Sequence, residues 1–162
     1  MPALTGVLET SLYVDDLERA SRFYEEVFAL TPMFGDDRLR AYGVGNRSVL
    51  LLFKRGASNC VTQLPYGALG PHDGHGPLHF AFSIAGDELT AWEEHLSLHR
   101  IEIESRIHWP RGGTSLYFRD PDNHLLELAT PGIWYLLKCV FASSPGIQFR
   151  ATASRALART PR

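Results

Sequence analysis

Residues 118–132 read FRDPDNHLLELATPG, a turn followed by a strand that carries one charged residue. The letters DPDN of residues 120–123 are typical of a turn, and residues 124–129 are predicted to form a strand. Glu127 lies inside the apolar run LLEL of residues 125–128. Because an unpaired charge is costly to bury, Glu127 needs a partner, and a divalent cation would supply one.

The segment before this turn contains a second candidate residue. Residues 78–84 alternate as a strand that places His79 on one face. A helix is predicted over residues 88–98, where Asp87 can cap the first turn. Two more strand-like runs lead to the quoted turn, over residues 101–107 and 114–118.

The first third of the chain shows the same order of elements. Residues 7–14 alternate as a strand with Glu9 on one face. Either Asp15 or Asp16 can cap a helix over residues 17–30, whose apolar residues recur at helical spacing. Two strands flank a Gly45-Asn46 hairpin turn, over residues 39–44 and 48–53.

We interpret this as the order strand, helix and three strands occurring twice, at an offset of roughly 70 residues, with two of the three later strands identified in the first third. The sequence predicts an α+β fold of two βαβββ modules, residues 6–55 and 77–134. The repeat aligns Glu9 with His79, and it aligns residues 46–47 with residues 123–124.

Two segments lie outside the modules. Residues 56–76 are rich in Gly, Pro and Ser and are predicted to be a flexible linker. Residues 135–162 carry basic but no acidic side chains, and we interpret them as a C-terminal tail without an assigned function.

The bulk composition fits a globular protein. Of 162 residues, 44% are hydrophobic and 21% charged, which argues against disorder. The net charge of -2 gives no reason to expect a nucleic-acid or membrane partner. No apolar run approaches the ~20 residues that span a bilayer, and no secretory signal is readable, so we expect a cytoplasmic protein.

Three stretches resemble the vicinal oxygen chelate superfamily, over residues 6 to about 134. They are LYVDDLERASRFYEEVFAL (residues 12–30), PLHFAFSI (residues 77–84) and the quoted residues 118–132. The superfamily includes glyoxalase I, fosfomycin resistance proteins, extradiol dioxygenases, methylmalonyl-CoA epimerase and bleomycin-binding proteins. The resemblance implies a glyoxalase-like cupped sheet built from the two modules.

The resemblance also implies a metal site. His79 and Glu127 match the family's ligand positions, and Glu9 stands where the third ligand is most often histidine. Glu9 is therefore either a metal ligand or a catalytic base. Glu127 is likewise assigned as a catalytic residue as well as a ligand. The ion is Mn, Fe, Ni, Co or Zn. A fourth ligand position falls near Leu50 or Leu52, and neither residue can coordinate a metal.

Candidate substrate-binding residues surround this set. Ser11 and Tyr13 share the face of Glu9, and Tyr117 has the same parity as Ser115. The WPRGG loop of residues 109–113 resembles a loop that leads to the cavity of fosfomycin resistance proteins. From this loop we expect Trp109 and Arg111 to contact substrate, with Gly112 and Gly113 giving it freedom. A second metal site at His72, His75 and His124 is disfavoured, because a Gly-rich loop with histidines is more often mobile.

Three functions follow, in this order. The first is a divalent-metal-dependent enzyme of the glyoxalase or fosfomycin-resistance type, acting on a small substrate chelated through vicinal oxygens. The second is an extradiol-type dioxygenase, against which Glu9 in place of a histidine counts. The third is a drug-sequestering protein of the bleomycin-resistance type. The resemblance also implies a homodimer, in which the site forms either within one chain or between two.

Overall fold

The computed structural model describes residues 1–134, so the predicted tail lies outside the described residues. The first module contains β1 (Glu9–Val14), α1 (Leu17–Phe28), β2 (Pro32–Gly35), β3 (Leu39–Val44) and β4 (Ser48–Lys54). The second contains β7 (His79–Ser83), a 3-10 turn (Gly86–Glu88), α2 (Leu89–Leu98), β8 (Ser105–His108), β9 (Thr114–Arg119) and β10 (Leu125–Ala129). The predicted pair of βαβββ modules is confirmed.

The two sheets have the same topology. Their strand orders are β1-β4-β3-β2 and β7-β10-β9-β8, and in each the first strand runs parallel to the last of its module. Glu9 pairs with Val49 in one sheet, and His79 pairs with Leu125 in the other. Glu9 and His79, which the sequence repeat aligns, therefore also occupy equivalent positions in the two sheets.

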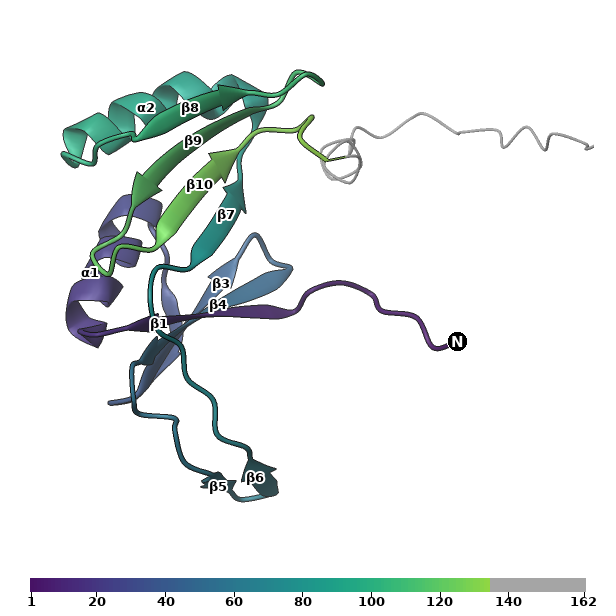
Figure 1. Ribbon diagram of the computed structural model, residues 1–162, viewed down its shortest axis with the longest axis vertical. Helices are drawn as coiled ribbons and strands as arrows, with labels where there is room; N and C mark the ends of the chain where they lie inside the picture. The colour runs from purple at the N-terminus through teal and green to yellow at the C-terminus, as the bar shows by residue number, and fades with distance from the viewer. Residues whose placement is uncertain (135–162) are drawn as a thin grey trace, which may run out of the picture.

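One face of each sheet is apolar and packs on the helices. Its fully buried residues include Leu12, Leu50 and Leu52 in the first sheet and Leu116, Phe118, Leu126 and Leu128 in the second. Figure 1 shows α2 along the second sheet and α1 beside the junction of the two sheets. The ring of Phe28 at the end of α1 lies 4.6 Å from the ring of Phe82 in β7, so one core spans both modules.

Helix α1 begins where the sequence predicts. Oδ1 of Asp16 accepts a hydrogen bond of 3.0 Å from the Arg19 amide, which satisfies one of the unpaired amides of the first turn. Of the two candidate caps, Asp16 fills the position, while Asp15 pairs with Arg55. The helix ends at Phe28, and Ala29 takes a left-handed conformation with φ of 51°.

One local prediction is wrong and one strand was missed. Asp87 does not cap α2, because it lies inside the 3-10 turn and its side chain makes no capping hydrogen bond. The segment between α1 and β3 contains strand β2, which the sequence analysis did not identify individually. All four residues of β2 are exposed, so it lacks the alternating burial that reveals a strand.

The linker is more ordered than expected. It contains the short hairpin of β5 (Thr62–Leu64) and β6 (Gly67–Leu69), which projects from the body in Figure 1. The amide of His72 donates to the Ser58 carbonyl at 2.9 Å, and the amide of Gly56 donates to Asp73 at 3.0 Å. These contacts hold the returning segment of the linker against residues 56–58, which follow β4.

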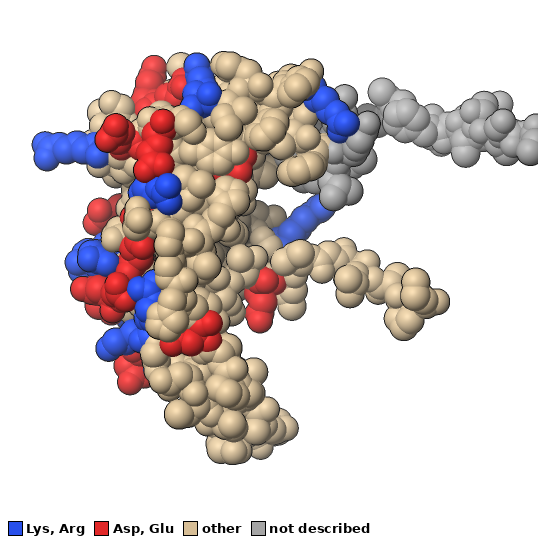
Figure 2. Space-filling model, in the orientation of Figure 1, with Lys and Arg blue, Asp and Glu red and all other residues tan. Residues whose placement is uncertain are grey.

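Charged side chains of both signs are mixed on the side of the molecule that carries α1 (Figure 2). Several form ion pairs, such as Arg40 with Glu18 at 2.6 Å and Arg19 with Asp122 at 3.1 Å. The second pair joins α1 to the turn before β10. Among the described residues, no helix is long and apolar enough to cross a membrane.

Candidate functional site

His79 and Glu127 lie on the face of the second sheet that is turned away from the helices. His79 begins β7 and Glu127 is in the centre of the neighbouring β10, diagonally across the parallel pair. The Nε2 atom of His79 is 3.2 Å from Oε2 of Glu127. The imidazole is half exposed, whereas the carboxylate is buried.

The hydrogen bonds of His79 fix its tautomer. Nδ1 lies 3.0 Å from the carbonyl oxygen of Leu125. A carbonyl can only accept, so Nδ1 carries the hydrogen. In the neutral imidazole, Nε2 then presents a lone pair toward the Glu127 carboxylate, which is also an acceptor. Two acceptors that face one another require a positive charge between them, either a proton or a metal ion.

The donor set fits a divalent ion. Zn–N and Zn–O bonds of about 2.0–2.2 Å put two ligands about 3 Å apart at a right angle and about 3.4 Å apart in a tetrahedron. The observed 3.2 Å between Nε2 and Oε2 lies between these values. Metal-binding histidines also commonly donate their other ring N–H to a backbone carbonyl, as His79 does.

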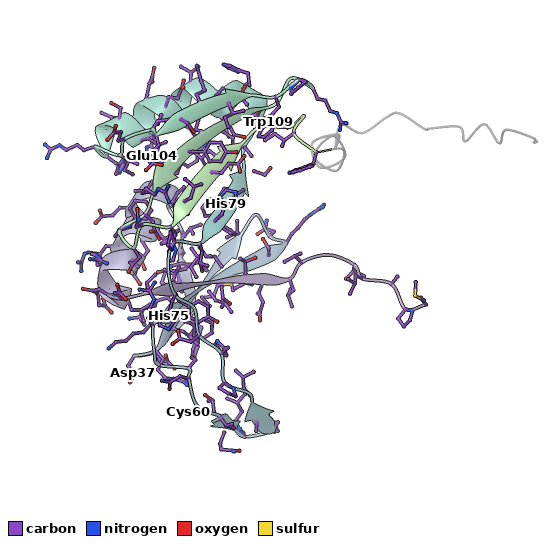
Figure 3. The ribbon with its side chains drawn as sticks, viewed as in Figure 1. Asp37, Cys60, His75, His79, Glu104 and Trp109 are labelled. Carbon is purple, nitrogen blue, oxygen red and sulfur yellow. The ribbon has the colours of Figure 1, made fainter. Side chains whose placement is uncertain are left out.

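The other oxygen of Glu127 has protein partners. The hydroxyl of Ser115 donates to Oε1 at 2.5 Å, and the indole Nε1 of Trp109 donates to Ser115 Oγ at 2.8 Å. Ser115 is fully buried. Figure 3 shows Trp109 beyond the end of β8, on the same module as His79. Trp109 was predicted to contact substrate, and no role was predicted for Ser115. Its alternation with Tyr117 was the available signal.

Tyr117 adjoins the pair. It sits opposite Glu127 in the antiparallel ladder of β9 and β10, and its ring centre is 6.1 Å from that of His79. Burial raises the pKa of Tyr117 most, the neighbouring Ser115 hydroxyl opposes the rise, and the charge of Glu127 and hydrogen bonding to it add to the rise. The net effect is a higher pKa, so the phenol keeps its proton and can donate a hydrogen bond.

The structure does not bring Glu9 to His79 and Glu127 within one chain. Glu9 is exposed at the start of β1 in the other sheet. In residues 1–134, no group of three His, Cys, Asp or Glu side chains is placed to hold a metal ion. A three-ligand site that includes Glu9 therefore needs a second copy of the chain.

Register corrects the predicted fourth position. In the second module, Glu127 pairs with Ala81, two residues after His79. In the first module, the matching partner of Ser11, two residues after Glu9, is Leu51. The equivalent of Glu127 is thus Leu51 rather than Leu50 or Leu52, whose side chains are fully buried in the core. Leucine at this position cannot coordinate a metal.

Ser11 and Tyr13 lie on the same face as Glu9, but Tyr13 is already engaged. Its hydroxyl is 2.8 Å from Nδ1 of His72, and its ring stacks on Phe53. Burial, followed by the nearby charge of Asp73, raises the pKa of Tyr13. Tyr13 therefore holds the linker on the first sheet, while Ser11 stays partly accessible.

The loop of residues 109–113 is tighter than expected. The Trp109 amide donates to the Gly113 carbonyl at 2.8 Å, and the Gly112 amide donates back to Trp109 at 2.9 Å. A Cβ on Gly113 would lie 2.8 Å from the backbone nitrogen of Ile133. Gly113 thus allows the loop to pack closely on residues 132–133 and does not make the loop mobile. Arg111 is exposed in this loop and makes protein contacts.

His124 and His72 contact residues of the fold other than His79 and Glu127. Nδ1 of the buried His124 accepts from the Leu78 amide at 3.0 Å, and Nε2 lies 3.0 Å from the Tyr13 carbonyl. His124 therefore ties both modules together. His72 contacts Tyr13, so neither histidine belongs to a second metal site with His75 among the described residues.

Comparison with known proteins identifies related sequences and folds. A model of the Glyoxalase/Bleomycin resistance protein/Dioxygenase superfamily matches residues 6–128. The metallothiol transferase FosB of Shouchella clausii (strain KSM-K16) is 26% identical over 129 residues, 78% of this chain and 81% of that protein. The fosfomycin resistance protein FosX of Listeria innocua serovar 6a is 28% identical over 128 residues, 77% of this chain and 89% of that protein.

A solved structure extends the comparison to the fold. The lactoylglutathione lyase from Agrobacterium tumefaciens superposes with a TM-score of 0.76 at 29% identity. The match covers 83% of this chain and 99% of that one. The FosX structure from Listeria monocytogenes, at 20% identity and a TM-score of 0.57, supports the same fold.

Proposed function

Because the chain belongs to the Glyoxalase/Bleomycin resistance protein/Dioxygenase superfamily, we propose that it is a divalent-metal-dependent enzyme of the glyoxalase or fosfomycin-resistance type. Its substrate is a small molecule that binds the metal through two neighbouring oxygens. The observation that carries the proposal is the lone pair of His79 Nε2 facing Oε2 of Glu127. The similarity to metallothiol transferases, a fosfomycin resistance protein and a lactoylglutathione lyase supports it.

His79 and Glu127 of one subunit hold the ion together with Glu9 of a second copy. Three protein ligands leave positions open for water or substrate oxygens. The bound ion supplies Lewis acidity, which stabilises negative charge that develops on those oxygens. Tyr117, opposite Glu127 in the ladder and beside His79, lines the substrate site. Trp109, Arg111, Ser11 and Tyr13 complete the lining, Tyr13 through its ring because its hydroxyl is engaged with His72.

Exposed apolar side chains support the homodimer. Met33 is 62% exposed, and its sulfur lies beside Gly43. Gly43 pairs with Val49 in the sheet, and Val49 in turn pairs with Glu9. Val7 and Leu8, just before Glu9, are 74% and 71% exposed. Large apolar side chains gathered around one site mark an interaction surface. A second copy that covers them brings its own His79 and Glu127 to Glu9.

The experiment combines elemental mass spectrometry with complementation between subunits. The native protein, purified without a metal-affinity tag, is expected to hold near-stoichiometric Mn, Fe, Ni, Co or Zn. Glu9→Gln, His79→Ala and Glu127→Ala each abolish this metal. When Glu9→Gln and Glu127→Ala chains are produced together, the mixed dimer contains one complete site, and about a quarter of the wild-type metal returns.

The outcomes separate the competing functions. If the native protein holds no metal and takes none up on titration, a proton occupies the gap between His79 and Glu127. Drug sequestration then becomes the favoured function, and drug binding to the metal-free protein tests it. Oxygen uptake with catechols by anaerobically iron-loaded protein would instead identify a dioxygenase. Metal that is lost in both single variants but not restored in the mixture contradicts the shared site.

A further inference from the structure

A chain of hydrogen bonds runs from Trp109 through Ser115 to Glu127, and its direction is fixed by chemistry. The indole N–H can only donate and the ionised carboxylate can only accept. Ser115 has a single hydroxyl hydrogen, which it must therefore give to Glu127, while its oxygen accepts from Trp109. The distance from Trp109 Nε1 to Ser115 Oγ is 2.8 Å, and the 2.5 Å from Ser115 Oγ to Glu127 Oε1 is at the short limit for a hydroxyl on a carboxylate.

This chain distinguishes the two oxygens of Glu127. Oε1 is occupied by the hydroxyl of Ser115, and Oε2 is left facing His79. Ser115 is fully buried and Glu127 is 7% exposed, so water does not readily replace the hydroxyl. A hydrogen bond to a charged acceptor is strong in such surroundings. Rotation of the carboxylate would break this bond.

We propose that Ser115 and Trp109 are positioning residues that hold the Glu127 carboxylate with Oε1 engaged and Oε2 directed at the cation site beside His79. The cation part of this proposal rests on the proposed function. The hydrogen-bond chain itself does not, because all its contacts are between protein side chains.

The backbone supports this role. Trp109 begins a turn that two hydrogen bonds close, to the carbonyl of Gly113 and from the amide of Gly112. The turn packs directly on Gly132, where an added Cβ would lie 2.7 Å from the Gly113 nitrogen. Thr114 and Thr130 then join the two strands, with the Thr114 amide donating to Thr130 Oγ1 at 2.7 Å. The indole is thus carried by a fixed segment of backbone.

The first test follows the indole N–H signals of the three tryptophans in metal-free protein by two-dimensional NMR. Trp109→Phe keeps an aromatic ring, removes the donor and identifies the Trp109 signal. Ser115→Ala is expected to shift this signal and to speed its exchange with water. Ser115→Thr, which keeps the hydroxyl, restores it. Ser83→Ala is the matched control, because Ser83 lies on the same face of the sheet but takes no part in the hydrogen bonds from Trp109 to Glu127.

The second test measures zinc affinity by competition with a chelator. Loss of a group that orients a metal ligand typically weakens binding by about 10- to 100-fold. We expect this loss in Ser115→Ala, a loss in the same direction in Trp109→Phe, and wild-type affinity in Ser115→Thr and Ser83→Ala. A general loss of folding would lower the thermal midpoint, which circular dichroism records for each variant.

The two tests fail separately. An unchanged Trp109 signal in folded Ser115→Ala overturns the hydrogen-bond chain. A changed Trp109 signal with wild-type zinc affinity shows that the hydrogen bonds from Trp109 to Glu127 exist but do not position the Glu127 carboxylate for the metal. This result also overturns the proposal. If the wild-type protein binds none of Mn, Fe, Ni, Co and Zn while the Trp109 signal responds to Ser115→Ala, the hydrogen-bond chain is supported and the proposed function is overturned.

Discussion

The hydroxyl of Tyr24 donates a hydrogen bond of 2.9 Å to Oδ2 of Asp120, and so links the helix of the first module to the last turn of the second. Both side chains are buried. Oδ1 of Asp120 accepts from the amides of Asp122 and His124, which shapes the turn before β10. Burial raises the pKa of Asp120, and these hydrogen bonds oppose the rise.

Replacement of Tyr24 by Phe should therefore destabilise the protein. It leaves a buried carboxylate oxygen without its donor, which costs about 1–3 kcal/mol. Tyr42→Phe is the matched control, because the hydroxyl of the equally buried Tyr42 donates to Glu25, which is only half-buried and can bind water instead. Chemical denaturation of both variants measures the difference. Equal losses would show that burial of the acceptor is not what makes the first contact important.

The cap of α1 gives a prediction about pH. Hydrogen bonding from the Arg19 amide lowers the pKa of Asp16 below its ordinary 3.8. A lowered pKa in the folded state adds stability that is complete above 3.8 and is lost as the pH falls through the folded-state pKa. The thermal midpoint of Asp16→Ala should thus lie below that of wild type at neutral pH, and this difference should narrow as the pH falls from 3.8 through the folded-state pKa.

Asp16→Asn separates the cap from its charge. Asparagine caps helices about as well as aspartate but does not titrate in this range. Its advantage over Asp16→Ala should stay constant as the pH falls, while that of wild type declines. Thermal unfolding followed by circular dichroism from neutral pH to pH ~3 compares the three proteins. A constant gap between wild type and Asp16→Ala would contradict the assignment.

The contact between residues 109–113 and the end of β10 depends on Gly132. Its φ of 111° is unfavourable for other residues, and an added Cβ would meet Gly113 and Arg111 backbone atoms at 2.7 and 3.0 Å. Gly132→Ala should therefore combine backbone strain of about 1–3 kcal/mol with a collision. Gly112→Ala, with φ of 90° and open space around its Cβ, has the strain alone.

The difference in unfolding free energy between these two alanine variants isolates the collision. Gly132→Ala should be less stable than Gly112→Ala by more than about 1 kcal/mol. Because Gly132 supports the turn that holds Trp109, its replacement should also disturb the Trp109 indole signal. Gly112→Ala should leave that signal in place. Similar stabilities would mean that the turn moves away from β10 without cost.

The sequence predicted those elements that have one buried face. Leu12 and Val14 alternate with accessible residues, so β1 was readable, and the same holds for β4. Strand β2 and the β5–β6 hairpin escaped prediction because almost none of their residues is buried. Their strand character comes from pairing with a neighbour, and a local pattern does not carry that information.

The candidate site divides in a similar way. The family resemblance implied that His79 and Glu127 belong to one ligand set with Glu9, and the structure places Nε2 of His79 3.2 Å from Oε2 of Glu127. The separation of Glu9 from this pair depends on how the modules pack, which periodicity does not encode. Ser115 becomes visible beside Glu127 only through the register of β9 and β10. The ligand and substrate roles of these residues stay predictions.

Leu51 offers a direct test of the register and of the metal site together. It lies on the face of Glu9, two ladder positions along, as Glu127 lies relative to His79. Leu51→Glu therefore adds a carboxylate beside Glu9, and in the proposed dimer it reaches the cation held by the other copy. Chelator competition should show tighter zinc binding by about tenfold or more, equal to about 1.4 kcal/mol.

The neighbouring leucine is the control for this variant. Leu52 is fully buried in the core, so Leu52→Glu places an unpaired charge there and should cost more than about 4 kcal/mol of stability. If instead the Leu51→Glu protein unfolds and the Leu52→Glu protein tolerates its charge, the assignment of faces is wrong. If Leu51→Glu folds with wild-type zinc affinity, Glu9 and its strand do not face the metal. The shared site would then have to be abandoned, with His79 and Glu127 left as a pair within one chain.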